Sequence, residues 1–523
     1  MERSRRMGCL KRTALVLLAA LLLVGLFALL FVRPRLSAPK PLRAEPTAAP
    51  SETSNENAAS LTAVATLKSA GLVLDDVTVI NPGVDRRPGQ TLALAGDRIE
   101  RIETAPAAAE RRGDGSFSGA FVLPGLIDLH HHLPPANILE LSGFACLLDL
   151  AWGVTTVRDV GDSDGTAVDG ARKGIAAGDF PGPRIFACGP YIDGGPPRWP
   201  NSVHLDGPAD AARVVADLKR AGYDCVKAYE DLTVADLRAL EAAAKKNGLQ
   251  MLGHVPTQLS YEQALVPETQ HFMGVAPPAS LPRDQIVERQ IDWHAVDRAR
   301  LDRIVAVTLE HGIVNTPTLV SHERLAGLAD PEAARRDPAV QLMPRMYRDV
   351  AWSPTEGFAF YRHLPAIDFV KLRDSLAKKK KLLYELYRAG AELRIGTDTP
   401  QPFVVPGASV HREMQIFHET GIPAEEVWAI ATWKGARGLP LAGLGTLREG
   451  SPADLLIFRR DPTQDLRNLD SLVAVVSRGR LYPKAQLDAA LAAYREHFAD
   501  PVFDRLSVES ARLILNQMVK RDY

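Results

Sequence analysis

The sequence predicts an α/β protein centred on a (β/α)8 TIM barrel, with a small composite β-sandwich domain formed from both flanks and an N-terminal transmembrane helix. Three observations carry this prediction. Apolar strand-like runs alternate with amphipathic helical runs in β/α units over residues 121–439. Short β-type runs lie on both sides of that region, and an uncharged apolar stretch lies near the N-terminus. In such a barrel, functional side chains lie at the C-terminal ends of the strands.

The N-terminus predicts a membrane anchor. Residues 1–12 carry five basic side chains, and residues 13–32 are twenty residues without a charge. A helix of that length spans about 30 Å, enough to cross a bilayer, so we expect an uncleaved single-pass anchor, with a cleaved signal peptide as the alternative. The excess of basic residues before the span is slight, and on it we expect the folded domain on the extracytoplasmic side. Residues 33–69, rich in Pro, Ala, Ser, Thr and Glu, predict a flexible tether.

Turn-separated β-type runs occupy residues 70–120 and 440–483, and we expect these two segments to form the small β-domain together. Residues 484–523 have apolar side chains at helical spacing and predict a helical appendage. Within the barrel, residues 321–391 are too long for an ordinary connection and contain several prolines and aromatic residues. We expect this insertion to form a lid or a pocket wall.

Composition excludes some classes of partner and site. The formal net charge of −1 provides no basic excess, which argues against a nucleic-acid partner. The four cysteines are widely spaced without a Cys-x-x-Cys pair, so they indicate neither a disulfide framework nor a thiolate metal site. Cys146, Cys188 and Cys225 lie in apolar runs and are expected to be buried thiols. The sequence does not predict an oligomeric state.

Side chains suited to a metal centre occur at the ends of the predicted strands. His130 and His132 share one face of the first strand, because alternate side chains of an extended strand point the same way. Singly, each such residue could be a buried core histidine, a strand-end lysine or a helix N-cap. Six of them share one relative position on the barrel, which predicts a divalent-metal site. The six are His130, His132, Lys227, His254, His271 and Asp398.

The chain resembles the metal-dependent amidohydrolase superfamily, in the branch that groups imidazolonepropionase-like proteins with Xaa-Pro and related dipeptidases. The resemblance covers residues 70–483. It rests on the motifs at residues 123–132, 153–159, 226–227, 253–254, 396–398 and 450–455.

The resemblance implies a ligand set and roles for its members. His130, His132 and Asp398 would hold the more buried metal, and His254 and His271 would hold the second. Lys227 would bridge the two metals as a carbamate formed with CO2. Zinc is the expected metal, with manganese and iron as alternatives. Asp398 would also accept a proton from the attacking water and pass it to the leaving amine.

The implied function is a membrane-anchored hydrolase that cleaves an amide, peptide or cyclic amide C–N bond of a small molecule or dipeptide, with a metal-bound hydroxide at a two-metal centre. One alternative is hydrolysis of an ester, lactone or phosphoester on the same site. Another is a barrel protein that binds a ligand without turnover. Tyr229, His322 and His411 are the candidate substrate contacts. Residues 193–204 depart from the simpler Gly-Gly-His loop of this branch, so its substrate specificity does not transfer.

Overall fold

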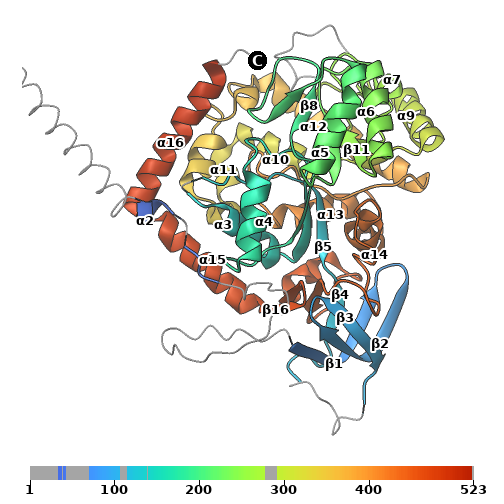
Figure 1. Cartoon of the computed structure of the whole chain (residues 1–523), viewed down its shortest axis with the longest axis vertical. Helices are drawn as coiled ribbons and strands as arrows, with labels where there is room; N and C mark the ends of the chain where they lie inside the picture. The colour runs from blue at the N-terminus through green and yellow to red at the C-terminus, as the bar shows by residue number, and fades with distance from the viewer. Residues whose placement is uncertain are drawn as a thin grey trace, which may run out of the picture.

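The computed structural model describes residues 33–37, 39–42, 70–106, 115–137, 139–276 and 291–520 (Figure 1). The predicted basic N-terminus and transmembrane helix, residues 1–32, lie outside this part. Among the helices that the structure does describe, none is both long enough and apolar enough to cross a membrane.

Parallel strands form the predicted barrel. β5, β6 and β7 make a three-stranded sheet, and β10 to β13 lie in a six-stranded sheet with β8 and β9. An extended segment, residues 393–399, closes the ring, because Leu393 bridges to Asn315 on one side and Thr399 to His131 on the other. The α/β barrel is therefore confirmed. Residues 393–399 are its eighth strand segment, and the other seven strands are β5 (Leu126–His131), β6 (Val154–Asp159), β7 (Arg184–Ala187), β10 (Cys225–Ala228), β11 (Gln250–Gly253), β12 (Glu268–Gln270) and β13 (Val314–Thr316). Two short strands, β8 (Tyr191–Asp193) and β9 (Ser202–His204), add to the edge of the sheet beside β10.

Helices surround these strands (Figure 1). The start of α6 shows how the sequence sets their boundaries. The Thr233 hydroxyl accepts a hydrogen bond from the Asp236 N–H, and the Asp236 carboxylate accepts one from the Thr233 N–H. The helices of the barrel are α3 (Ser142–Ala151), α4 (Ala167–Ala176), α5 (Ala211–Arg220), α6 (Val234–Lys246), α7 (Tyr261–Ala264), α9 (Arg298–His311), α12 (Ala366–Arg388), α13 (Ala408–Glu419) and α14 (Ala424–Ala429).

The insertion between β13 and α12 is a series of short helices. It begins with α10 (Leu319–Leu325) and α11 (Pro331–Arg335). The 3-10 helix η6 (Val340–Leu342), the π-helix η7 (Met346–Ala351) and the 3-10 helix η8 (Ala359–Tyr361) follow. The C-terminal helices α15 (Lys484–Phe498) and α16 (Pro501–Lys520) run along one side of the molecule (Figure 1), and α16 contacts η7 and η8.

Strands from both flanks of the barrel form one mixed sheet, in the order β16-β15-β14-β4-β1-β2-β3. β4 pairs in parallel with β1 and antiparallel with β14, so it joins the two flanks directly. For that reason the hydrogen bonds make one continuous sheet and not the two separate sheets of the predicted β-sandwich. The strands are β1 (Ala70–Asn81), β2 (Asp85–Ala95), β3 (Arg98–Thr104), β4 (Phe121–Pro124), β14 (Leu455–Phe458), β15 (Leu472–Ser477) and β16 (Arg480–Pro483).

The start of the predicted tether is packed against the folded protein. The short helix α2 (Arg33–Leu36) contacts α16, and Leu36 and Leu42 are buried in the main core. Lys40 forms a 2.8 Å ion pair with Asp179. Burial of a leucine stabilises by about 1.5–3 kcal/mol, which favours this docked conformation over a free chain. The flexible-tether prediction is therefore wrong for these residues, and the remainder of the tether lies outside the described part.

Cys188 and Cys225 form a disulfide, where the sequence predicts two separate buried thiols. Cys188 follows β7 and Cys225 begins β10. A 2.7 Å hydrogen bond from the Asp224 N–H to the Ala187 carbonyl holds the two strands together, and the two Cα atoms are 4.3 Å apart. The cysteines are separated by 37 positions in the sequence, so only the barrel geometry brings them together. Cys146 is a free buried thiol, as predicted.

A buried carboxylate links four barrel strands. Glu268 of β12 binds Arg158 of β6 and Arg394 of the eighth strand segment, and it accepts a 2.8 Å hydrogen bond from Thr316. The side chains of the three charged residues are at most 5% exposed. Burial alone raises the pKa of Glu268, but Arg158 and Arg394 outweigh it and lower this pKa to about 2. Glu268 is therefore the shared counter-ion of two buried guanidinium groups inside the barrel.

Glu268→Gln should lower the free energy of unfolding at pH 7 by about 3–5 kcal/mol, because two buried guanidinium groups lose their counter-charge. The folded pKa lies below the ordinary carboxyl value, so this contribution is present above about pH 4.5 and is lost as the pH falls towards 2. Urea unfolding at pH 7 and at pH 3 measures both effects. Glu241→Gln, which removes an exposed partner of Arg238, is the control and should change stability by less than about 1 kcal/mol. Equal losses in the two variants would contradict the prediction.

Candidate metal centre

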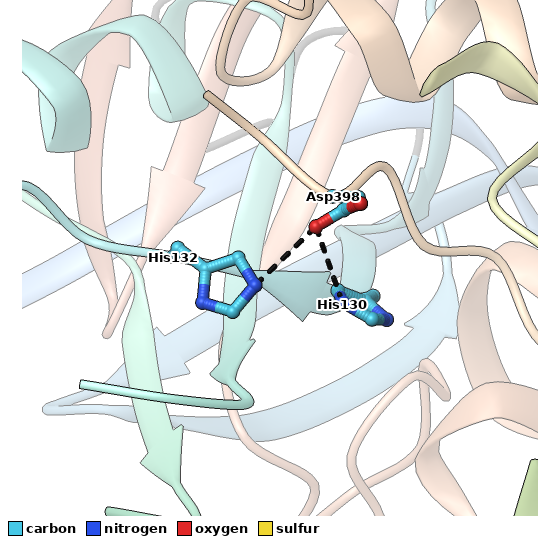
Figure 2. A group of neighbouring side chains, drawn as sticks. All are labelled: His130, His132 and Asp398. Atoms are coloured by element: carbon cyan, nitrogen blue, oxygen red, sulfur yellow. Dashed lines mark ion pairs between the residues drawn. The ribbon is translucent and has the colours of Figure 1, made fainter. Parts of the chain in front are cut away.

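Three side chains from opposite ends of the barrel sequence converge on one point (Figure 2). Nε2 of His130 and Nε2 of His132 each lie 3.3 Å from Oδ1 of Asp398. One ligand-type atom from each of the three residues lies within 4.8 Å of the others. The His132 and Asp398 side chains are 18% and 13% exposed, so solvent reaches the cluster.

Backbone hydrogen bonds between the first and eighth strands place Asp398. Its N–H donates to the His130 carbonyl at 2.7 Å. The N–H and the hydroxyl of Thr397 both donate to the buried carboxylate of Asp128, at 3.1 and 2.6 Å. Asp398 has a left-handed backbone, with φ of 64°, which costs about 1–3 kcal/mol and requires surroundings that impose it. The Asp128 contacts supply that constraint.

Two further histidines extend the cluster. The His271 ring lies 4.6 Å from the His130 ring and 5.0 Å from the His254 ring. Nε2 of His271 lies 4.0 Å from Oδ2 of Asp398. The four predicted histidines and the aspartate therefore form one continuous group, drawn from the ends of β5, β11, β12 and the eighth strand segment.

Other protein groups orient the imidazole rings. Nδ1 of His132 lies 3.0 Å from the Gly161 carbonyl, and Nδ1 of His271 lies 2.6 Å from the Thr318 hydroxyl. In both residues Nε2 then faces Asp398. Such partners fix the tautomer and the ring orientation of a metal ligand.

A carboxylate orients His254. Nδ1 of His254 lies 2.8 Å from Oε1 of Glu230, and Oε2 of Glu230 lies 3.3 Å from the buried guanidinium of Arg198. Arg198 belongs to the loop between β8 and β9. This loop therefore supports a histidine of the cluster through one intervening acid.

Lys227 lies at the end of β10 and is 1% exposed. Its ammonium donates a hydrogen bond to Oε1 of Gln270, the residue before His271. Burial lowers the pKa of Lys227 to about 7, although Asp398 and Glu230 act in the opposite direction. The lysine amine is therefore uncharged in a substantial fraction of molecules near neutral pH.

The protonation states suit a divalent metal. Burial lowers the pKa of His130, His254 and His271 well below the usual value, and the Lys227 charge adds to this effect. The rings are thus neutral, the form that binds metals. Burial raises the pKa of Asp398, but His271 and His132 outweigh it and keep the group ionised. Neutral imidazoles around one carboxylate are a donor set for zinc, manganese or iron.

Tyr229, a predicted substrate contact, lies beside the cluster. Its ring lies 4.8 Å from the ring of His254, and its hydroxyl accepts a 3.0 Å hydrogen bond from Nε1 of Trp199. The Tyr191 ring lies 4.8 Å from that of Tyr229 and 5.7 Å from that of Trp199. An aromatic wall of Tyr191, Trp199 and Tyr229 therefore borders one side of the site.

The insertion completes this wall. Trp199 and Phe360 have ring centres 6.5 Å apart, and Phe360 contacts Tyr361. Burial raises the pKa of Tyr361, and the carboxylates of Asp398 and Glu230 raise it further, which places this phenol within electrostatic reach of the cluster. The sequence singled out neither Tyr361 nor Trp199. The sequence signal that could have identified them is the presence of aromatic residues in two long connections, residues 193–204 and 321–391.

The structure does not bring the other two predicted substrate contacts to the cluster. His322 is buried between Ser375, 2.7 Å from Nε2, and Lys379, 3.2 Å from Nδ1. Nε2 of His411 lies 2.7 Å from the carbonyl of Trp152, which precedes β6 and so lies at the opposite end of that strand from the metal cluster. Both histidines therefore contact other protein groups and do not lie in the metal cluster.

The comparisons with known proteins agree with this geometry. A model described as "Amidohydrolase family" matches residues 121–482. Uncharacterized proteins of Mycobacterium tuberculosis and Mycobacterium bovis are 26% identical to the chain over 400 residues, which covers 73% of this chain and 90% of theirs.

Solved structures share the fold. A bottromycin amidohydrolase is 23% identical with a TM-score of 0.62, covering 82% of this chain and 91% of its own. A Xaa-Pro dipeptidase with methionine bound in its active site is 21% identical with a TM-score of 0.58, covering 79% of this chain and 100% of its own. A putative prolidase from Bifidobacterium longum is 22% identical with a TM-score of 0.56, covering 82% and 100%.

Glu230→Gln should weaken metal binding by about 10–100-fold, because the amide removes the negative charge behind His254. Competition with a chromogenic chelator measures the affinity. Glu241→Gln, on the surface of α6, should bind metal like the wild type. An unchanged affinity in Glu230→Gln, with the fold intact by circular dichroism, would show that Glu230 does not support a ligand.

Proposed function

The chain belongs to the amidohydrolase family of hydrolases acting on C–N bonds, and on this premise we propose that it hydrolyses an amide bond of a dipeptide, an N-acyl amino acid or a cyclic amide at a two-metal centre. The observation that carries the proposal is the convergence of His130, His132 and Asp398. His254 and His271 would complete the ligand set, with Lys227 between the two metals.

The environment of Lys227 supports a bridging role. Only the neutral amine attacks CO2, and burial makes that form available near neutral pH. The attack forms an N–C bond and releases one proton, which leaves a carbamate anion with two oxygens. An anion at this position would compensate for two cations more effectively than the Gln270 side chain that Lys227 contacts.

The chain's own residues can then carry the proton and orient the substrate. A divalent metal, when bound, supplies Lewis-acid polarisation and lowers the pKa of water. Asp398, ionised and partly exposed, can accept the proton of the attacking water and return it to the leaving amine. Burial raises the pKa of Tyr229 well above its usual value, so the phenol keeps its proton and can donate a hydrogen bond to a substrate oxygen.

The direct test is metal analysis of the purified protein, followed by a substrate screen. The screen pairs each dipeptide, N-acyl amino acid and cyclic amide with its ester or lactone counterpart, and includes phosphoesters. Metal-dependent turnover of amides supports the proposal. Preferential turnover of esters, lactones or phosphoesters would assign the site to a different bond, and the absence of turnover with metal bound would favour a binding protein.

We also propose that residues 13–32 anchor the protein in a membrane in a single pass, with the barrel on the extracytoplasmic side. The sequence of the span supports the anchor. The disulfide between Cys188 and Cys225 supports the location, because disulfides persist in oxidising compartments and are rare in the cytosol.

Lys227→Ala should reduce the metal content from about two ions to one or fewer and lower turnover by orders of magnitude. Lys379→Ala is a matched control, since Lys379 is also buried and its pKa is likewise lowered by burial, but it contacts His322 outside the cluster. Metal analysis and kinetics measure both effects, and bicarbonate should help to reconstitute only proteins that retain Lys227. One metal per chain in the wild type, with near-normal turnover in Lys227→Ala, would contradict the two-metal centre.

Protein recovered from its native membrane without reductant should carry Cys188 and Cys225 in one disulfide-linked peptide pair. After unfolding, iodoacetamide should label Cys146 at once and should label the pair only after reduction. Peptide mass mapping reads both results. Immediate labelling of Cys188 and Cys225 would place the barrel in a reducing compartment and contradict the proposed orientation.

A further inference from the structure

A cavity of about 350 Å³ lies away from the metal cluster, where the insertion meets the C-terminal helices. The insertion contributes Leu342, Arg345 and Arg348 to its lining, and α15 contributes Arg495 and Phe498. None of the six predicted metal-site residues lines this cavity. The mechanism proposed above gives it no role.

The charge of the cavity lining is unbalanced. Three arginines and one acid, Asp504, line it, which leaves two positive charges in excess. The charge of Asp504 is already compensated by Arg345, which forms a 2.7 Å ion pair with it. Arg345 forms a second ion pair, also at 2.7 Å, with Asp349. Within the described residues, neither Arg348 nor Arg495 forms an ion pair.

Arg348 also has unused hydrogen-bonding capacity. Its Nη1 donates to Oε1 of Gln341 at 2.7 Å, but its buried Nε has no hydrogen-bond partner in the described structure. A buried donor without a partner destabilises the folded state. Burial lowers the pKa of Arg348, the carboxylate of Asp349 acts in the opposite direction, and the charge of Arg345 lowers this pKa further. An anion in the cavity would compensate for the excess positive charge of its lining.

The shape and composition of the cavity indicate which anion. Guanidinium groups bind phosphate through paired hydrogen bonds. The volume is larger than one inorganic ion requires, and Leu342 and Phe498 supply an apolar surface beside the arginines. A phosphate that carries an organic substituent satisfies both parts of the lining.

We propose that this cavity binds a phosphate ester, with the phosphate held by Arg348 and Arg495 and the organic part against Leu342 and Phe498. The ester can be a soluble metabolite or the headgroup of a phospholipid. The second source is favoured by position, because α2, which begins directly after the predicted membrane span, packs on α16, the helix that contributes Asp504 to the lining.

Isothermal titration of the full-length protein in a neutral detergent tests the proposal. Glycerol 3-phosphate, compared with glycerol, tests the soluble source. Dioctanoyl phosphatidylglycerol, compared with dioctanoylglycerol, tests the lipid source. Arg495→Gln and Arg348→Gln should each weaken binding at least about tenfold. The matched control is Arg505→Gln, which removes an exposed arginine of α16 outside the cavity.

Binding of either phosphate compound that is weakened by Arg495→Gln and retained in Arg505→Gln supports the proposal that the cavity binds a phosphate ester. Binding of the lipid alone identifies a headgroup site. Arg495 is exposed, so its variant tests the proposal even if Arg348→Gln unfolds. The proposal is wrong if neither phosphate compound binds the wild type, or if Arg505→Gln weakens binding as much as Arg495→Gln does.

Discussion

The metal cluster depends on the closure of the barrel between its eighth and first strands. The Leu129 N–H donates to the Ile395 carbonyl at 3.0 Å, and the His132 N–H donates to the Thr399 carbonyl at 3.0 Å. Between these two bonds, Asp128 holds Thr397. Histidines near residue 130 and an aspartate near residue 400 can share a ligand position only while this seam is intact. The metal-ligand group therefore forms only when the eighth strand segment pairs with β5.

Around this seam, two surface connections form the rest of the site. The loop after β8 provides Arg198, which supports His254 through Glu230, and Trp199, which binds Tyr229. The insertion provides Phe360 against that same tryptophan. The barrel strands thus supply the ligands, while the loop and the insertion together determine what can approach them. Substrate selectivity should follow these two segments and not the strands.

The sequence could predict the strand-end residues because their signal is local: an apolar run followed by a histidine, lysine or aspartate. His254 and Asp398 needed only their neighbours in the chain to be recognised. His411 has the same residue type but lies on α13, and its Nε2 contacts the Trp152 carbonyl, away from the cluster, so residue type alone did not determine its place. The contact between Cys188 and Cys225 depends on strands 37 positions apart, and no local pattern encodes it.

The mixed sheet can form fully only late in the synthesis of the chain, because two of its neighbouring strands are far apart in the sequence. β4 needs β14 as its antiparallel neighbour, but about 330 residues lie between them, which takes roughly 15–65 s to synthesise at about 5–20 residues per second. During that interval one edge of β4 has no strand beside it, and apolar side chains such as Val122 lack the opposing Ile457. An unpaired apolar edge is a site of aggregation. The nascent chain therefore needs protection at this edge until β14 has been synthesised.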